Sequence, residues 1–176
     1  PLSLKMGMDK ARDVLMANGE KEDLAGECRR ASILTLVELY RSDKFEHLVL
    51  LESYSNIEEK FDRDSGWFYH VVPLVGNEDG WFVGSGFSCQ KEQEWLVGPV
   101  TLEEAIWQLT EIEGCTWPSV SFAQDLVDKG KSMVEFFDDG GYYSIPTLVY
   151  EDGQVLVDTT RVRLQDNGLP LGVCLD

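Results

Sequence analysis

The chain has 176 residues, of which 43% are hydrophobic and 11% aromatic, and this composition suits one globular domain with a sizeable core and excludes disorder. Its 15 basic and 32 acidic residues give a formal net charge of −17. Because neither a phosphate clamp nor a basic patch is visible, we expect no direct binding to nucleic acid or to an anionic membrane. A surface of this charge suits a basic protein partner, although solubility alone also explains it, and the oligomeric state is open.

The four cysteines are widely spaced and form neither a CxxC pair nor a cluster with histidine, so the sequence predicts no metal site. Two disulfides remain possible, but a chain of this length does not need them. No apolar run approaches the length of a membrane span, and no signal segment is visible. The sequence begins at Pro1 without a methionine, so we expect residues 1–4 to be the remnant of an expression tag.

Two amphipathic helices are predicted first, over residues 5–18 and within residues 23–40. The clearest hairpin follows, with strands at 67–75 and 81–83 around a Gly- and Asn-containing turn. Thr101 and Glu104 form a capping-box pattern at the start of a third helix. A terminal β-hairpin region is expected over residues 140–176. This order of elements predicts one α+β domain over residues 1–176, with N-terminal helices packed on a central antiparallel sheet.

Cys28 is the first candidate functional residue, since Gly26-Glu27-Cys28 opens the second helix. Backbone N–H groups and the positive end of the helix dipole favour the thiolate form of a cysteine in the first turn. His70, one of only two histidines, lies in the predicted strand 67–75. A histidine on a neighbouring strand can accept the thiol proton and return it later, so the sequence predicts that the two side chains meet.

These segments resemble the papain-like bacterial protein-glutaminases and glutamine-deamidase toxins over residues 24–110. The residues that carry the resemblance belong to the helix start, the histidine strand, its hairpin partner and the third helix start. They are Gly26, Cys28, Tyr69, His70, Val71, Pro73, Trp81, Val83 and the segment 99–104. The resemblance implies a papain-like fold, and a protein that acts in the bacterial cytoplasm or as a secreted effector.

In that family the helix cysteine is the nucleophile, the strand histidine is the base, and an aspartate after the next strand orients the imidazole. The resemblance assigns the first two roles to Cys28 and His70. The third position falls at Gly84 or Ser85, and neither is a carboxylate.

Other side chains within sequence reach are therefore considered for the orienting role. They are Ser85 itself, through its hydroxyl group, and Asn77, Asp79 and Gln90. Tyr69 and Trp95 are candidates for substrate binding, and Cys89 is an alternative reactive thiol.

The implied reaction is attack of the Cys28 thiolate on a glutamine side-chain amide of a protein substrate, followed by hydrolysis. Transglutamination and proteolysis would use the same intermediate, and no cofactor or metal is implied. The competing hypothesis is a catalytically degraded scaffold that acts as an acidic binding, inhibitor or immunity-type module. The absent carboxylate favours this alternative. Structural roles also remain open, with Cys28 as a small buried hydrophobe and His70 as a hydrogen-bonded histidine.

Overall fold

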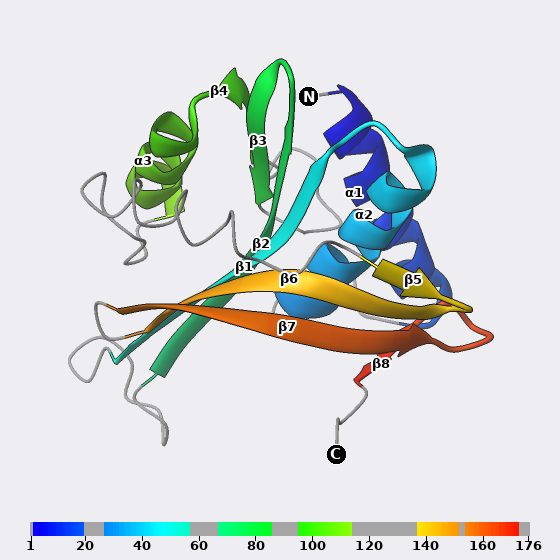
Figure 1. The fold of residues 1–176 in the computed structure, drawn as a ribbon. Coiled ribbons are helices and arrows are strands. Elements are labelled where there is room, and N and C mark those ends of the chain that lie inside the picture. The colour runs from blue at the N-terminus through cyan, green and yellow to red at the C-terminus, as the bar shows by residue number, and fades with distance from the viewer. Residues whose placement is uncertain are drawn as a thin grey trace.

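The computed structural model of the protein describes residues 2–19, 27–56, 67–85, 95–113, 137–151 and 154–172. These residues form three helices and eight strands, joined in the order shown in Figure 1. The helices are α1 (Leu2–Ala17), α2 (Cys28–Ser42) and α3 (Leu102–Glu113). The strands are β1 (His47–Asn56), β2 (Trp67–Asn77), β3 (Gly80–Ser85), β4 (Trp95–Val100), β5 (Phe137–Asp139), β6 (Tyr142–Glu151), β7 (Gln154–Leu164) and β8 (Pro170–Gly172).

One twisted sheet contains all the described strands, in the order β4-β3-β2-β1-β6-β7-β8, with β5 paired to β6 off this path. Neighbouring strands are antiparallel except β1 and β6, which run parallel with Leu50 opposite Thr147. The α+β class is confirmed, but the prediction of an antiparallel sheet is wrong, because β6 joins β1 from the C-terminal hairpin in the same direction. The sheet is mixed.

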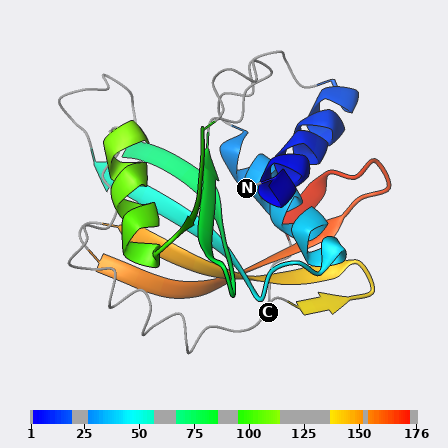
Figure 2. The same ribbon diagram turned by 90° about the horizontal axis from the view of Figure 1, so that it is seen from above.

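Each face of the sheet carries its own hydrophobic cluster. The first cluster joins α1 and α2 to one face and includes Leu36, Leu50 and Val71, while the second joins α3 to the other face and includes Val72 and Ile106. Figure 2 shows α3 on one side of β3 and the pair α1–α2 on the other. The sheet therefore separates two apolar layers, and α2 and α3 lie on opposite sides of it.

Local sequence signals account for several of the element boundaries. The Thr101 hydroxyl accepts the backbone N–H of Glu104 at 3.1 Å, so Thr101 caps the start of α3 as predicted, while the Glu104 carboxylate accepts a hydrogen bond from Gln108. The β2–β3 hairpin closes with Asn77 opposite Gly80, and the Asn77 side chain accepts the N–H of Asp79. At the other end of this ladder, pairing stops at Leu74, immediately after Pro73, whose nitrogen has no hydrogen to donate.

The N-terminal residues take part in the fold. Residues 2–4, expected to be a tag remnant, form the first turn of α1, and Leu4 is completely buried in the first cluster. Among the described residues, no helix is both long enough and apolar enough to cross a membrane.

Candidate functional site

His70 lies on β2, and its Nε2 is 3.0 Å from the hydroxyl oxygen of Ser85 on β3. The backbone partner of His70 on β1 is Ser53, and Ser53 in turn lies opposite Tyr150 on β6. Ser53 and Ser85 are completely buried, whereas His70 is half-buried. The imidazole therefore sits among hydroxyl-bearing residues of neighbouring strands, and Ser85 stands beside it where the family resemblance implies a carboxylate.

Cys28 is the first residue of α2, as the sequence predicts, and Glu27 precedes it as the N-cap without a side-chain cap. The thiol is half-exposed and packs against the first cluster. It is a free cysteine, and within the described part of the chain it makes no hydrogen bond. Its position at the helix start agrees with the prediction, but its packing is that of a small hydrophobe.

The structure does not bring the Cys28 thiol to the His70 imidazole. Successive strand residues face opposite sides of a sheet, and Val71 belongs to the first cluster with Cys28, while Val72 belongs to the second. His70 therefore shares the face of Val72, as does its contact Ser85, two residues beyond Val83 of the second cluster. The sheet backbone separates the two predicted catalytic groups, so the predicted meeting is wrong.

Gly84 is not an orienting position, because a side chain at this position would point toward Met8 of α1 and away from His70. A Cβ built on Gly84 would lie 2.5 Å from the Met8 sulfur and 3.1 Å from a Leu96 methyl carbon. Real Cβ atoms essentially never lie as close as 2.5 Å to another atom, so a side chain at position 84 would force the Met8 side chain to shift. Of the two positions named from the sequence, only Ser85 contacts the imidazole.

The remaining predicted residues divide into three groups. Asn77 and Asp79 lie at the β2–β3 turn, seven and nine residues along the chain from His70. The Asn77 side chain donates to the Lys44 carbonyl there, so neither residue orients the imidazole. Trp95 begins β4 opposite Ser85 and packs against the second cluster, on the same face as His70. Cys89 and Gln90 lie outside the described residues, and so does the side chain of Tyr69.

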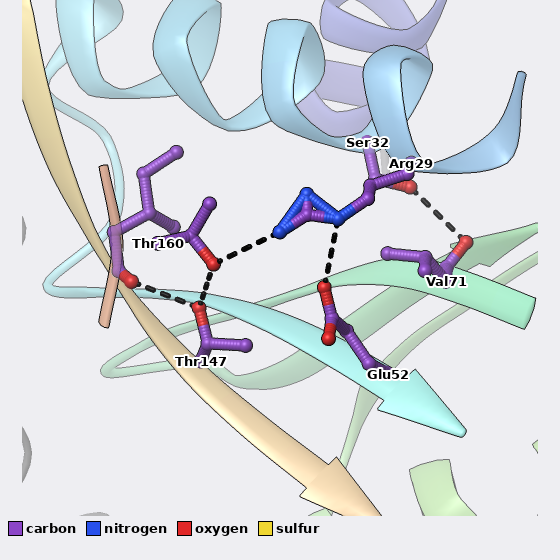
Figure 3. Close-up of polar contacts among 7 residues, drawn as sticks. Arg29, Ser32, Glu52, Val71, Thr147 and Thr160 are labelled. Atoms are coloured by element: carbon purple, nitrogen blue, oxygen red, sulfur yellow. Dashed lines mark hydrogen bonds and ion pairs between the residues drawn. The ribbon is translucent and has the colours of Figure 1, made fainter. Parts of the chain in front are cut away.

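A polar network that the sequence did not reveal joins the start of α2 to the sheet (Figure 3). Arg29 Nε lies 3.1 Å from a carboxylate oxygen of Glu52, whose side chain is 6% exposed, and Arg29 Nη2 donates to the Thr160 hydroxyl at 3.4 Å. The Thr160 and Thr147 hydroxyls are 2.6 Å apart, and Ser32 donates to the Val71 carbonyl. Glu52 directly follows the apolar run of residues 48–51, and residues 48–53 are all buried, so the only sign of the pair in the sequence was an acid at the end of that run.

The described geometry does not favour thiol chemistry at Cys28. Nucleophilic catalysis needs the base within hydrogen-bond reach of the nucleophile, and here a sheet lies between them. No group of three or more His, Cys, Asp or Glu side chains that could hold a metal ion occurs among the residues that the structure describes. Comparison of the chain with protein-family models, with curated proteins and with solved structures found no match.

Proposed function

We propose that this chain is a non-catalytic, acidic protein-binding module, built on a scaffold that resembles the papain-like glutamine deamidases. The observation that carries the proposal is the location of Cys28 and His70 on opposite faces of the sheet. Gly84, packed against Met8, and Ser85, in contact with His70, support it as well, because neither supplies the carboxylate of an active deamidase.

The net charge of −17 suits a basic protein partner. At one end of the sheet, exposed acidic residues come together from the α2–β1 connection and the β2–β3 turn: Asp43, Glu46, Glu78 and Asp79. Hydrogen bonds from Glu46 N to Gly76 O and from Asn77 Nδ2 to Lys44 O hold the two segments side by side. Lys44 is the one basic residue within these two segments. These four carboxylates make this end of the molecule a contact site suited to a basic partner.

The experiment that tests the proposal measures ammonia release from casein, a glutamine-containing protein, by the wild type and by Cys28→Ala. The expected result is the same background release from both proteins, since no base is in reach of the thiol. Release by the wild type that is lost in Cys28→Ala would overturn the proposal.

A second candidate function is glutamine deamidation itself, with Cys28 as nucleophile and His70 as base. Two observations favour it: Cys28 is the first residue of α2, and His70 is hydrogen-bonded to the strand that follows. This function requires β2 and α2 to rearrange so that the imidazole and the thiol share a face. The ammonia assay separates the two candidates, because only deamidation depends on both side chains.

A further inference from the structure

Two arginines of β7 carry charges that no carboxylate of the described residues balances. Arg161 and Arg163 make neither an ion pair nor a hydrogen bond there through their guanidinium groups, although Arg163 lies over the Tyr142 ring, 6.0 Å from its centroid. The described basic residues of α1 and of the start of α2, by contrast, all pair with carboxylates: Lys5, Lys10, Arg12, Arg29 and Arg30. In a chain with 32 acidic residues, these two positive charges remain available to another molecule.

Both arginine side chains lie on the sheet face opposite α1 and α2. Thr160 and Val162 alternate with them along β7 and face the helices, since Val162 belongs to the first cluster and Thr160 accepts a hydrogen bond from Arg29 of α2. Arg161 and Arg163 therefore share the other face, and both are exposed. The helix on that face, α3, packs on β3 and β4, at the far end of the strand order from β7 (Figure 1).

Two hydroxyl-bearing residues of β6 stand beside the arginines. In the antiparallel pairing Tyr142 lies opposite Arg163, and Ser144 lies opposite Arg161. Residues directly opposite each other share a face, with Cβ atoms about 4.5–5.5 Å apart. Tyr142 is 48% exposed and Ser144 is half-buried. These four residues, the arginine patch, combine two guanidinium forks with two hydroxyl groups.

A depression of about 580 Å³ adjoins the arginine patch at Arg163. Its other lining residues belong to the β5–β6 turn, at 140–141, and to the segment 164–167 that follows β7. A Cβ built on either glycine of that turn would meet no atom within 4 Å. One acid, Asp166, lies in the lining, and it forms no ion pair with Arg163 in the described structure. A group bound to Arg163 therefore has room beside the strand.

The charge and the donors of the arginine patch match a phosphate group better than a carboxylate. A phosphorylated side chain carries a charge of about −1.5 to −2 at pH 7 and three acceptor oxygens, so one such group balances both arginines. A carboxylate carries a single charge and balances only one of them. The net charge of −17 repels polyanions, which favours a single phosphate within an otherwise neutral or basic segment.

We propose that the arginine patch binds a phosphorylated side chain of a partner protein. Arg161 and Arg163 hold the phosphate oxygens through charge-assisted hydrogen bonds, and the hydroxyl groups of Tyr142 and Ser144 supply further donors. This inference rests on the proposed binding function and assigns one of its contacts. The acidic end of the molecule attracts a basic partner, and the arginine patch makes binding depend on phosphorylation of that partner.

The test uses two heptapeptide libraries, with phosphoserine or phosphotyrosine at the central position and random residues elsewhere, selected on the immobilised protein. Fluorescence anisotropy then measures the affinities of the selected peptides. We expect removal of the phosphate, or its replacement by glutamate, to weaken binding about tenfold or more. Arg161→Gln and Arg163→Gln should each weaken the phosphorylated peptides about tenfold and leave the unphosphorylated forms unchanged.

Lys10→Gln is the matched control, because it removes the same charge from a side chain of α1 that is 59% exposed, on the other face of the sheet. It should bind the phosphorylated peptides as the wild type does. In the unaltered protein, the Nε–H signals of Arg161 and Arg163 in nuclear magnetic resonance spectra should shift when a selected phosphopeptide is added.

The inference is overturned if the selected peptides bind equally with and without phosphate, or if the glutamate version binds as tightly as the phosphorylated one. It also fails if both arginine variants bind like Lys10→Gln. Inorganic phosphate that competes at the concentration of the peptide itself would show a site for the free anion and would overturn docking of a partner. All these results leave the proposed binding function in place, whereas thiol-dependent ammonia release removes that function.

Discussion

At the scale of single residues, positions 84 and 85 show how the candidate site departs from a catalytic one. The side chain of Ser85 contacts the imidazole of His70 across the β2–β3 pair, so this position carries the polar contact. Gly84 faces the other layer, where Met8 fills the space that a side chain would need. An acid at position 84 would therefore enter the first cluster and would not reach His70.

Gly84→Asp should lower the free energy of unfolding by at least about 3 kcal/mol, because it adds both overpacking and a buried charge. Urea denaturation measures the effect. Gly172→Asp is the matched control, since a Cβ at Gly172 would meet no atom within 4 Å, and its effect should stay within about 0.5 kcal/mol. Equal stability of the two variants would contradict the packing described for Gly84.

Arg29 should be required for stability because Glu52 is buried beneath it. Arg29→Met leaves the Glu52 carboxylate without its guanidinium, and removal of one partner of a buried pair typically costs about 3–5 kcal/mol. Since Arg29 itself is 38% exposed, water can reach the site, and we expect a smaller loss of about 2–3 kcal/mol. Urea denaturation of Arg29→Met and of exposed Arg161→Met measures the difference; equal losses would show that the ion pair contributes nothing.

At the scale of elements, the two apolar layers should respond to mutation independently. Leu36 on α2 and Ile106 on α3 are both fully buried, in the first and second clusters respectively. Each change to alanine should cost about 2–5 kcal/mol in unfolding free energy.

The double variant should show the sum of the two losses within about 0.5 kcal/mol, because the sheet separates the sites. A double-mutant cycle in urea measures this coupling. A coupling energy well above that limit would show that α2 and α3 pack on a common core, contrary to the two-layer arrangement.

Elements with local signals could be predicted from the sequence, whereas their placement in the sheet could not. The Thr101 cap, the β2–β3 turn and the C-terminal hairpin all depend on neighbouring residues, and all three were predicted. The parallel pairing of β1 with β6 joins segments about a hundred residues apart and leaves no local pattern.

Which face of the sheet His70 occupies could not be predicted from the sequence either. Strand β2 is buried on both sides, with Val71 in one cluster and Val72 in the other, so its apolar residues do not alternate with polar ones. The separation of Cys28 and His70 in the sequence was therefore compatible with a catalytic pair, but the alternation of side chains along β2 places His70 on the face of the sheet away from Cys28. The Arg29–Glu52 pair was missed because neither residue belongs to a recognisable motif.

At the scale of the whole molecule, the net charge of −17 should make the fold sensitive to salt. Repulsion among like charges destabilises a compact state, and added salt screens it. The midpoint of thermal unfolding should rise between low and physiological NaCl concentrations, as measured by circular dichroism. A midpoint that falls would show that the described ion pairs, such as Lys10–Glu38, outweigh the net repulsion.

The separation of Cys28 from His70 is tested most directly by the rate at which iodoacetamide alkylates Cys28, followed by mass spectrometry of the peptide that contains it. A histidine that activates a thiol accelerates its alkylation, so wild type and His70→Gln should differ greatly if the two form a catalytic pair. With the sheet between them, the account predicts the same rate at Cys28 in both proteins across neutral pH. A rate that falls tenfold or more in His70→Gln, about 1.4 kcal/mol, would contradict it.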